Sequence, residues 1–387
     1  MTHARTLLLT AALAALALVS PATAASPAVA GSPVLGPNQV TMGDRVPWSQ
    51  VGQGWRLTLI NQGPHGEFGI DARHQLLDLV DPLGGRYQLA KTAVGQDGSG
   101  YRRLVDWSTD GRTALEVVDP QKKPQRAVFY DLRAGTHRAV RVGDHVDSLR
   151  LGPHASLYET RYGGMRGEPL LRRYDDGTLQ LLRRHTDGQP LTTRSTRRIV
   201  IGTHGDHDHR LLVLGGDGRL VRSLATPAKC TATRWWRHGV LMATCFGRHG
   251  ASRLYAAPVD GGAGHWISAD HGKRSADLGD LDARRLNGTT YLEASGPCGV
   301  VFLARQHRNG AATEVQVPKA VENVYLLGTR GHRLVLQMGV SCDGGMSRDA
   351  ITHFDPRTSD NRVVALLPEN EEYGPVLGFA EPEPDPS

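Results

Sequence analysis

The chain has 387 residues, of which 39% are hydrophobic and 22% charged, and its formal net charge is +6 at pH 7. Its 46 glycines and 22 prolines are spread along the whole length, and this excess of turn-forming residues favours many short strands over long helices. The lack of a Gly-X-Y period excludes collagen. Balanced charges and recurring apolar runs argue against disorder. The arginines alternate with acids and form no long basic run, so we expect no nucleic-acid partner.

The N-terminus has the pattern of a secretory signal peptide. Residues 1–5 are short and basic, residues 6–20 are apolar, and residues 21–24 are small in the A-x-A arrangement. We therefore expect residues 1–24 to be removed on export and residues 25–44 to form a flexible lead-in. The apolar run is shorter than a comfortable membrane span, so the mature protein is expected to be a secreted, soluble monomer outside the cell or in the periplasm or cell-wall space.

A β-rich hairpin recurs along the chain at intervals of 42 to 50 residues. Its turns are anchored on Asp81, Asp131, Asp175, Asp217, Asp260, Asn309 and Asp355. A second hairpin lies between successive members, most clearly at residues 104–117. Four turn-separated strands in a period of roughly 40–50 residues are typical of a β-propeller blade. The sequence therefore predicts an all-β fold, a seven-bladed β-propeller of four-stranded blades over residues 45–379, with an acidic, Pro-rich tail at 380–387.

We name the strands of a blade a to d from the central axis outward. The first blade is expected to open with a hairpin at residues 46–57, which contains its inner strand. The seven blades are expected to start near Val46, Arg102, Val146, Ser195, Thr231, Ala283 and Val321.

The stretch Trp107-Ser108-Thr109-Asp110-Gly111-Arg112 resembles the repeat of TolB-like propellers, in which a Ser/Pro-x-Asp-Gly turn joins the inner two strands. The period covers about residues 45–370, whereas the motif is sharp in one blade. The resemblance implies a TolB-like secreted β-propeller. TolB proteins also carry an N-terminal α/β domain that binds partners. We expect that domain to be absent here, because only about 20 mature residues precede the first blade.

The four cysteines are Cys230, Cys245, Cys298 and Cys342. In an exported protein cysteines pair by default, and the lack of a C-x-x-C spacing disfavours a metal site; free or metal-bound thiols are the alternative. Cys230 and Cys245 face each other if a hairpin turns between Arg237 and His238. Cys298 and Cys342 fall in the b–c loops of consecutive blades. We expect residue 230 to pair with 245 and residue 298 with 342.

A His/Asp-rich loop is expected between strands b and c of the fourth blade. Its candidate metal ligands are His204, Asp206, His207 and His209. Imidazole and carboxylate ligands at this spacing in a loop can converge on zinc or another divalent cation. The alternative is a solvated polar loop in which Asp and Gly make the turn. No cofactor is expected beyond this candidate metal.

The other b–c loops lie on the same rim, where a propeller usually places its ligand at the mouth of the channel. The candidate ligand-binding residues there are His65, Glu67, Arg166 and His249. No G-x-S-x-G elbow and no H-E-x-x-H motif occurs, so no catalytic residue is assigned.

The sequence favours a secreted, non-catalytic propeller that acts as a binding or protein-interaction scaffold. Its partner would be a protein or a cell-envelope component. The alternative is a metal-assisted hydrolase or lyase with its site on the rim. A third hypothesis is the binding of an anionic cell-envelope polymer through the scattered arginines.

Overall fold

The structure, a computed structural model, describes residues 35–63, 73–95, 98–118, 125–143, 146–163, 167–193, 197–205, 209–246, 251–270, 279–296, 299–341, 347–369 and 371–378. The chain divides into two compact units, Met1–Ser32 and Pro33–Ser387. All described residues belong to the second unit, and the following account concerns that unit alone. The expected signal peptide and the acidic tail lie outside the described residues. None of the helices within these ranges has the length and apolarity needed to cross a membrane.

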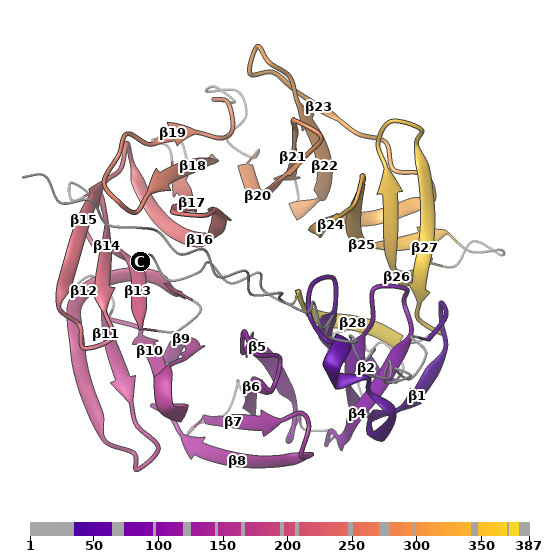
Figure 1. The fold of residues 1–387 in the computed structure, drawn as a ribbon, viewed down its shortest axis with the longest axis horizontal. Helices are drawn as coiled ribbons and strands as arrows, with labels where there is room; N and C mark the ends of the chain where they lie inside the picture. Colours follow the sequence, from indigo (N-terminus) through magenta and orange to yellow (C-terminus); the bar gives the residue numbers. More distant parts are fainter. Residues whose placement is uncertain are drawn as a thin grey trace, which may run out of the picture. The chain divides into compact units, whose positions relative to one another are not determined.

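The second unit is all-β, and its described residues contain strands and three short 3-10 helices but no α-helix. The strands form six sheets that follow one another around a ring in the arrangement of a β-propeller (Figure 1). Four of these sheets have four antiparallel strands each, one has five strands and one has seven. In the four-stranded sheets the first strand in sequence lies nearest the centre of the ring and the last lies outermost (Figure 1).

The four-stranded sheets follow the chain order. The first comprises β5 (Arg102–Trp107), β6 (Thr113–Val118), β7 (Arg126–Asp131) and β8 (Thr136–Arg141). The second comprises β16 (Lys229–Arg237), β17 (Val240–Phe246), β18 (Ser252–Pro258) and β19 (His265–Trp266). The third comprises β20 (Gly279–Leu286), β21 (Thr289–Ser295), β22 (Val301–Gln306) and β23 (Ala312–Glu314). The fourth comprises β24 (Ala320–Arg330), β25 (Arg333–Ser341), β26 (Ser347–Asp355) and β27 (Asp360–Leu366).

The expectation of seven separate four-stranded sheets is wrong, because one strand serves two sets of partners. The seven-stranded sheet comprises β9 (Val146–Leu151), β10 (Leu157–Arg161), β11 (Glu168–Arg173), β12 (Leu179–Thr192), β13 (Arg198–Thr203), β14 (Arg210–Gly215) and β15 (Leu220–Ala225). The first half of β12 pairs with β11 and its second half with β13. The partner changes at Thr186, which lies opposite both Glu168 and Thr203. His185, at φ +55°, precedes it, and Gly188, at φ +78°, falls where the register with β13 shifts.

The five-stranded sheet joins the two ends of the described chain. It comprises β1 (Val40–Met42), β2 (Arg56–Gln62), β3 (His74–Val80), β4 (Arg86–Ala93) and β28 (Glu371–Gly378). β28 lies beside β2 in antiparallel register, with Gly378 opposite Arg56, and Gln62 Nε2 donates to Glu371 Oε1 at 2.6 Å. The C-terminal strand therefore closes the ring.

The expected inner strand near Val46 is wrong, because β28 takes its place. Residues 46–53 contain the 3-10 helix η2 (Trp48–Gln50) instead, and Pro47 has no backbone N–H to donate to a strand ladder. The lead-in also differs from a purely flexible segment. Its residues 40–42 form β1, which pairs with β4 in parallel, and η1 (Gly43–Arg45) follows. The third 3-10 helix, η3 (Pro153–Ala155), lies between β9 and β10.

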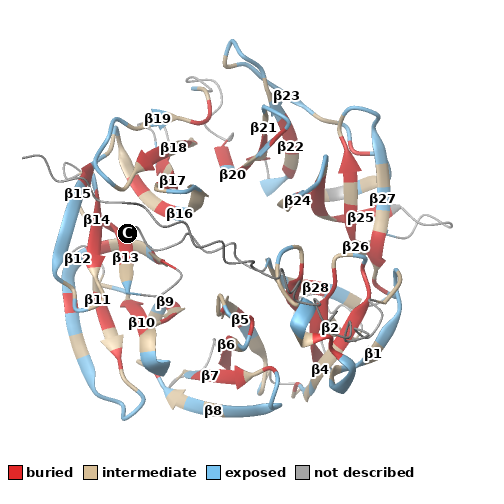
Figure 2. Ribbon diagram, viewed as in Figure 1, coloured by how far each residue is buried: buried red, intermediate tan, exposed pale blue. Residues whose placement is uncertain are grey.

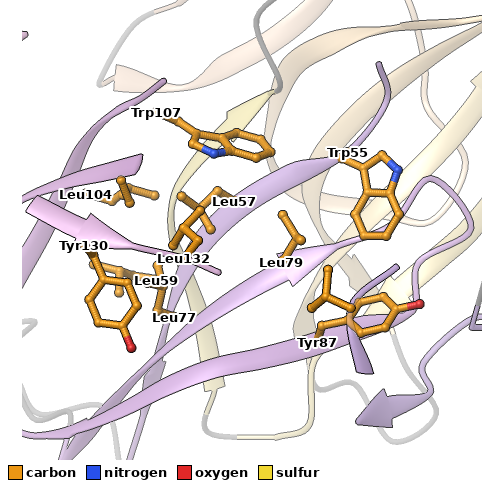
Figure 3. Close-up of a cluster of buried hydrophobic side chains, with 12 residues drawn as sticks. Trp55, Leu57, Leu59, Leu77, Leu79, Tyr87, Leu104, Trp107, Tyr130 and Leu132 are labelled. Atoms are coloured by element: carbon orange, nitrogen blue, oxygen red, sulfur yellow. The ribbon is translucent and has the colours of Figure 1, made fainter. Parts of the chain in front are cut away.

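The core lies between neighbouring sheets. Buried residues are concentrated on middle strands such as β6 and β17, whereas the outermost strands β8 and β15 are mainly exposed (Figure 2). β2 shows how the period of two in a strand serves both neighbours. Trp55, Leu57 and Leu59 belong to a cluster that includes Leu104 and Trp107 of β5 (Figure 3). On the opposite face of β2, Ile60 belongs to a cluster with Val335, Ile351 and Val364 of the last sheet.

The predicted disulfide between Cys230 and Cys245 is confirmed. The two cysteines are direct partners on β16 and β17 and are 3% and 1% exposed. The turn lies one residue further along than predicted, with Arg237 opposite Val240, and two register shifts in β16 preserve the pairing of the cysteines. Cys298 and Cys342 lie outside the described residues, so their pairing stays a prediction.

Replacing both Cys230 and Cys245 with alanine removes a cross-link between residues 15 apart in sequence. The chain-entropy model gives such a loop a value of about 3 kcal/mol, so the free energy of unfolding should fall by that order in a urea titration monitored by tryptophan fluorescence. Non-reducing peptide mapping of the wild-type protein supplies the control. An unchanged urea midpoint in the double variant would contradict the prediction.

Candidate functional site

A cavity of about 1600 Å³ opens at one end of the central channel. It is lined by residues from all six sheets, at the ends where each innermost strand turns toward the next strand, and by residues of the outer strands β7 and β8. Residues 105–109 contribute from the end of β5 and the turn after it, residues 234–238 from the end of β16 and the turn after it, and residues 326–329 from the end of β24. The second unit thus converges on a single concave site from positions hundreds of residues apart in sequence.

The lining of this cavity is strongly basic. Its arginines are Arg56, Arg138, Arg150, Arg197, Arg234, Arg237, Arg284 and Arg285. Its acidic residues are Asp106, Asp131 and Asp282. Aromatic surface is contributed by Trp55, Trp107, Phe129, Trp235 and Trp236. A recess that concentrates charge of one sign attracts ligands of the opposite sign, so the cavity is suited to an anionic group.

Three of the arginines also connect neighbouring parts of the ring. Arg150 Nη1 donates to the carbonyl oxygen of Val105 at 2.6 Å, from β9 to β5. Arg234 Nη2 donates to the carbonyl of Ala283, from β16 to β20. Arg284 Nη2 donates to the carbonyl of Leu327 at 3.5 Å, from β20 to β24. Their first role is therefore structural, because each holds the wall of the channel together through a backbone acceptor.

The aspartates of the cavity are engaged as well. Asp282 accepts from Arg234 Nε at 2.7 Å and from Arg284 Nη1 at 2.9 Å, so one carboxylate serves two guanidinium groups. Asp106 accepts the backbone N–H of Leu151 through Oδ2 at 2.7 Å. Burial raises the pKa of Asp106, and the neighbouring Arg150 acts in the opposite direction. The acids therefore stabilise the wall and leave an excess of positive charge.

Arg56 is the buried exception among these arginines. Its side chain lines the cavity, and the residue is 6% exposed. Nη1 donates to the carbonyl of Gly54 at 3.0 Å, but Nε is buried without a hydrogen-bond partner. Within the described ranges no carboxylate lies within ion-pair distance of it. Burial, followed by the like charges of Arg284 and Arg330, lowers the pKa of Arg56 to about 10.

The pKa of His353 on β26 is affected by the same positive charges. Burial lowers its pKa to about 4, and Arg330 and Arg56 act in the same direction. The imidazole is therefore neutral at physiological pH and offers no countercharge to Arg330 or Arg56. Arg333 also lowers the pKa of His353, although its guanidinium is paired with Asp360 at 2.7 Å.

Most of the residues predicted on the b–c rim lie outside the described residues. These are His65, Glu67, Arg166, His249, Asp206 and His207. His204 follows β13 and His209 precedes β14, so both flank the expected loop. The amide of His204 donates to the carbonyl of His185 at 3.0 Å. Among the described residues no group of three His, Cys, Asp or Glu side chains could hold a metal, and the loop site stays a prediction.

The arginine-lined cavity was missed by the sequence analysis. The arginines of the inner strands do recur, as Arg150, Arg234 and Arg284 show, but they lie among many surface arginines. That these arginines lie at the same end of the channel is seen only in the folded structure. Trp235 and Trp236, adjacent in sequence, both line the cavity; Trp235 Nε1 donates to the carbonyl of Thr192 at 3.0 Å, and Arg234 lies over the Trp236 ring at 5.4 Å.

No protein-family model matches the sequence, and no curated protein matches it. Among solved structures, a prolyl endopeptidase superposes with a TM-score of 0.53 at 11% identity, covering 84% of this chain and 51% of the peptidase. A puromycin-hydrolyzing peptidase from Mycobacterium tuberculosis gives 0.44 at 13% identity, with 85% and 55% covered. TolB from Acinetobacter baumannii gives 0.38 at 13% identity, with 89% and 87% covered. The chain spans about half the length of the two peptidases, and the likeness to the first concerns the fold alone.

The electrostatic coupling between Arg56 and His353 can be measured by NMR titration of the imidazole. We expect Arg56→Met to raise the pKa of His353 from about 4, because a buried positive charge that disfavours the imidazolium is removed. The unfolded chain, with a histidine pKa near 6.5, takes up a proton first as the pH falls. The free energy of unfolding therefore decreases between pH 6.5 and 4, and the variant should lose less of it. An unaltered His353 titration would contradict the coupling; Arg237→Met, on the exposed rim, is the control.

Proposed function

We propose that the chain is an exported, TolB-like propeller of seven blades that acts as a non-catalytic binding scaffold. In this proposal it takes an acidic segment of a partner protein of the cell envelope into the arginine-lined cavity. The observation that carries the proposal is the lining itself, in which eight arginines face three aspartates. The signal-peptide pattern and the disulfide between Cys230 and Cys245 support an oxidising location outside the cytoplasm.

The double role of β12 supports the count of seven blades. Its first half completes a four-stranded set with β9, β10 and β11, and its second half begins a set with β13, β14 and β15. The five other sheets each contribute one further set, with β28 as the inner strand of the sheet that contains β2. On this interpretation every blade supplies residues to the cavity from the end of its inner strand.

The kinds of side chain in the cavity support a protein partner. Arginine and tryptophan are enriched among the residues that dominate protein–protein binding energies. Trp235 and Trp236 are half-buried, so part of each ring can be covered by a partner. Guanidinium groups form bidentate hydrogen bonds with carboxylates, and an exposed pair such as Arg237 and Arg285 can make first contact with an acidic segment.

The proposal is tested by titrating the purified mature protein with a decamer of glutamate while tryptophan fluorescence is recorded. We expect saturable binding that weakens as salt is raised from 50 to 500 mM (about one order of magnitude in ionic strength), because exposed charge pairs are screened. A lysine decamer of equal length is the control peptide. Arg237→Glu together with Arg285→Glu should weaken binding by roughly tenfold or more, since two attractive contacts become repulsive.

The titration has clear contrary outcomes. Equal binding of the glutamate and lysine decamers would show that charge does not select the ligand. Binding that survives the double charge reversal unchanged would place the ligand away from this cavity. Either result would contradict the proposed function.

A metal-assisted hydrolase or lyase is the second candidate function. The observation in its favour is His209, whose Nδ1 is buried without a hydrogen-bond partner beside the loop predicted to bind metal. Metal analysis of the purified protein should then give one divalent ion per chain, and His204→Ala and His209→Ala should each reduce that content. Full metal content in both variants would contradict this loop as the site, and metal-free protein would contradict the candidate function.

A further inference from the structure

The buried side chain of Arg56 has a hydrogen-bond donor, Nε, without an acceptor. A buried guanidinium that lacks both a countercharge and a full set of acceptors destabilises the folded state. Arg56 is 6% exposed, and its Nε has no acceptor. Among the described residues, the carbonyl of Gly54 is the acceptor for its side chain. Within the described ranges, the charges that influence it most are those of two other arginines, Arg284 and Arg330.

The structural role that explains other cavity arginines does not extend to Arg56. Arg150 reaches the carbonyl of Val105 in a neighbouring sheet and also Gln189 Oε1 at 2.8 Å. Arg234 and Arg284 share the carboxylate of Asp282. Arg56 donates instead to Gly54, two residues earlier in the chain. Among the described residues its side chain therefore links no two sheets and pairs with no carboxylate.

The position of Arg56 is fixed by its neighbours in sequence. Trp55 and Leu57 are buried in the cluster between β2 and β5 (Figure 3), and the Trp55 ring packs on Tyr87 with a centroid distance of 5.6 Å. Alternation along the strand sends Arg56 to the opposite face. Gly378 of the closing strand β28 lies directly across from it. The backbone of Arg56 is therefore fixed, and its side chain is directed toward the cavity face of the strand.

The Nη2 side of Arg56 faces a glycine of the cavity wall. Gly328 on β24 lines the cavity, and a Cβ at this residue would lie 3.7 Å from Arg56 Nη2. Because glycine has no Cβ, no side chain of residue 328 covers the guanidinium edge. Arg284 is on the neighbouring β20, its side chain 20% exposed, and it supplies a second positive charge near the same place.

We propose that Arg56, supported by Arg284, is an oxyanion-binding subsite at the base of the cavity. The inference rests on the proposed function, because it names the chemical group that the partner presents there. A carboxylate oxygen could accept from the free Nε–H while a second oxygen accepts from Nη2–H, which is the side-on bidentate arrangement of guanidinium with a planar anion. The same two donors could serve a phosphoryl group, so the shared chemistry is an oxyanion and the test distinguishes the two sources.

The test compares the thermal unfolding of the mature protein in chloride, acetate and inorganic phosphate at equal ionic strength and pH. Acetate or phosphate should raise the Tm of the wild type above its value in chloride, by about 2 °C at a tenfold excess over Kd. Arg56→Met should abolish this increment and raise the Tm in chloride, because an unpaired buried charge is replaced by an apolar chain of similar length. Arg308→Met, in the exposed turn between β22 and β23 and outside the cavity lining, should keep the increment.

Two further variants separate the charge of Arg56 from its shape and its accessibility. Arg56→Lys keeps the positive charge but loses the planar fork, and should retain a reduced increment. Gly328→Val leaves Arg56 intact but places a side chain over Nη2, and should lose the increment while the protein stays folded. A response to both anions identifies a carboxylate-binding site. A response to phosphate alone supports the oxyanion subsite and assigns the source to a phosphoryl group.

The inference is overturned if neither anion raises the Tm of the wild type, or if Arg56→Met retains the increment. Titration of Arg56→Met with the glutamate decamer then separates the two proposals. Binding as tight as that of the wild type would leave the proposed function standing and refute the Arg56 subsite. If the wild-type protein does not bind the glutamate decamer, the proposed function is refuted.

Discussion

The pairing of β28 with β2 is the constraint on which the rest of the second unit depends. A ring of sheets has no free edge only when its first and last members are joined, and here the last strand of the described chain lies beside β2. The same pairing places Gly378 opposite Arg56 and brings Tyr373 beside the last sheet, where its amide donates to Asp349 at 2.9 Å. Opening this joint would expose the cluster around Ile60 and remove the strand that lies beside Arg56. The same strand pairing therefore closes the ring and determines the surroundings of Arg56 in the cavity.

The arginines of the channel divide into two classes through that geometry. One class reaches a neighbouring sheet. Arg150 and Arg284 belong to it, and their N–H groups donate to backbone carbonyls and, for Arg284, to a carboxylate. Their contribution is a rigid wall with its polar groups satisfied. Arg56, at the joint itself, is buried by the same closure but has no acceptor for Nε. A rigid wall around an unsatisfied donor lowers the ordering cost of binding, because the side chain need not be immobilised when a ligand arrives.

The sequence was informative about local chemistry and less so about how the strands combine. The spacing of turns anchored on Asp131 and Asp217 correctly indicated repeated hairpins, because a turn leaves a local signal in glycine, aspartate and asparagine. The pairing of Cys230 with Cys245 was also accessible, since it depends on one hairpin. By contrast, the shared strand β12 and the closing strand β28 depend on pairings between distant segments, for which one sequence carries no pattern. Pro47 was the one local signal against an inner strand near Val46.

The location of the candidate site shows the same division more sharply. Chemical types alone directed attention to His204 and the b–c rim, because imidazoles clustered in sequence are easy to see. The arginines at the other end of the inner strands are dispersed in sequence, and their function depends on which acceptors each one finds in space. Arg234 and Arg56 cannot be told apart by residue type or by neighbouring aromatic residues. One shares Asp282 with Arg284 and the other has no carboxylate among the described residues. A charge becomes available for binding when the fold buries it and leaves its donors unused, and that condition is a property of packing.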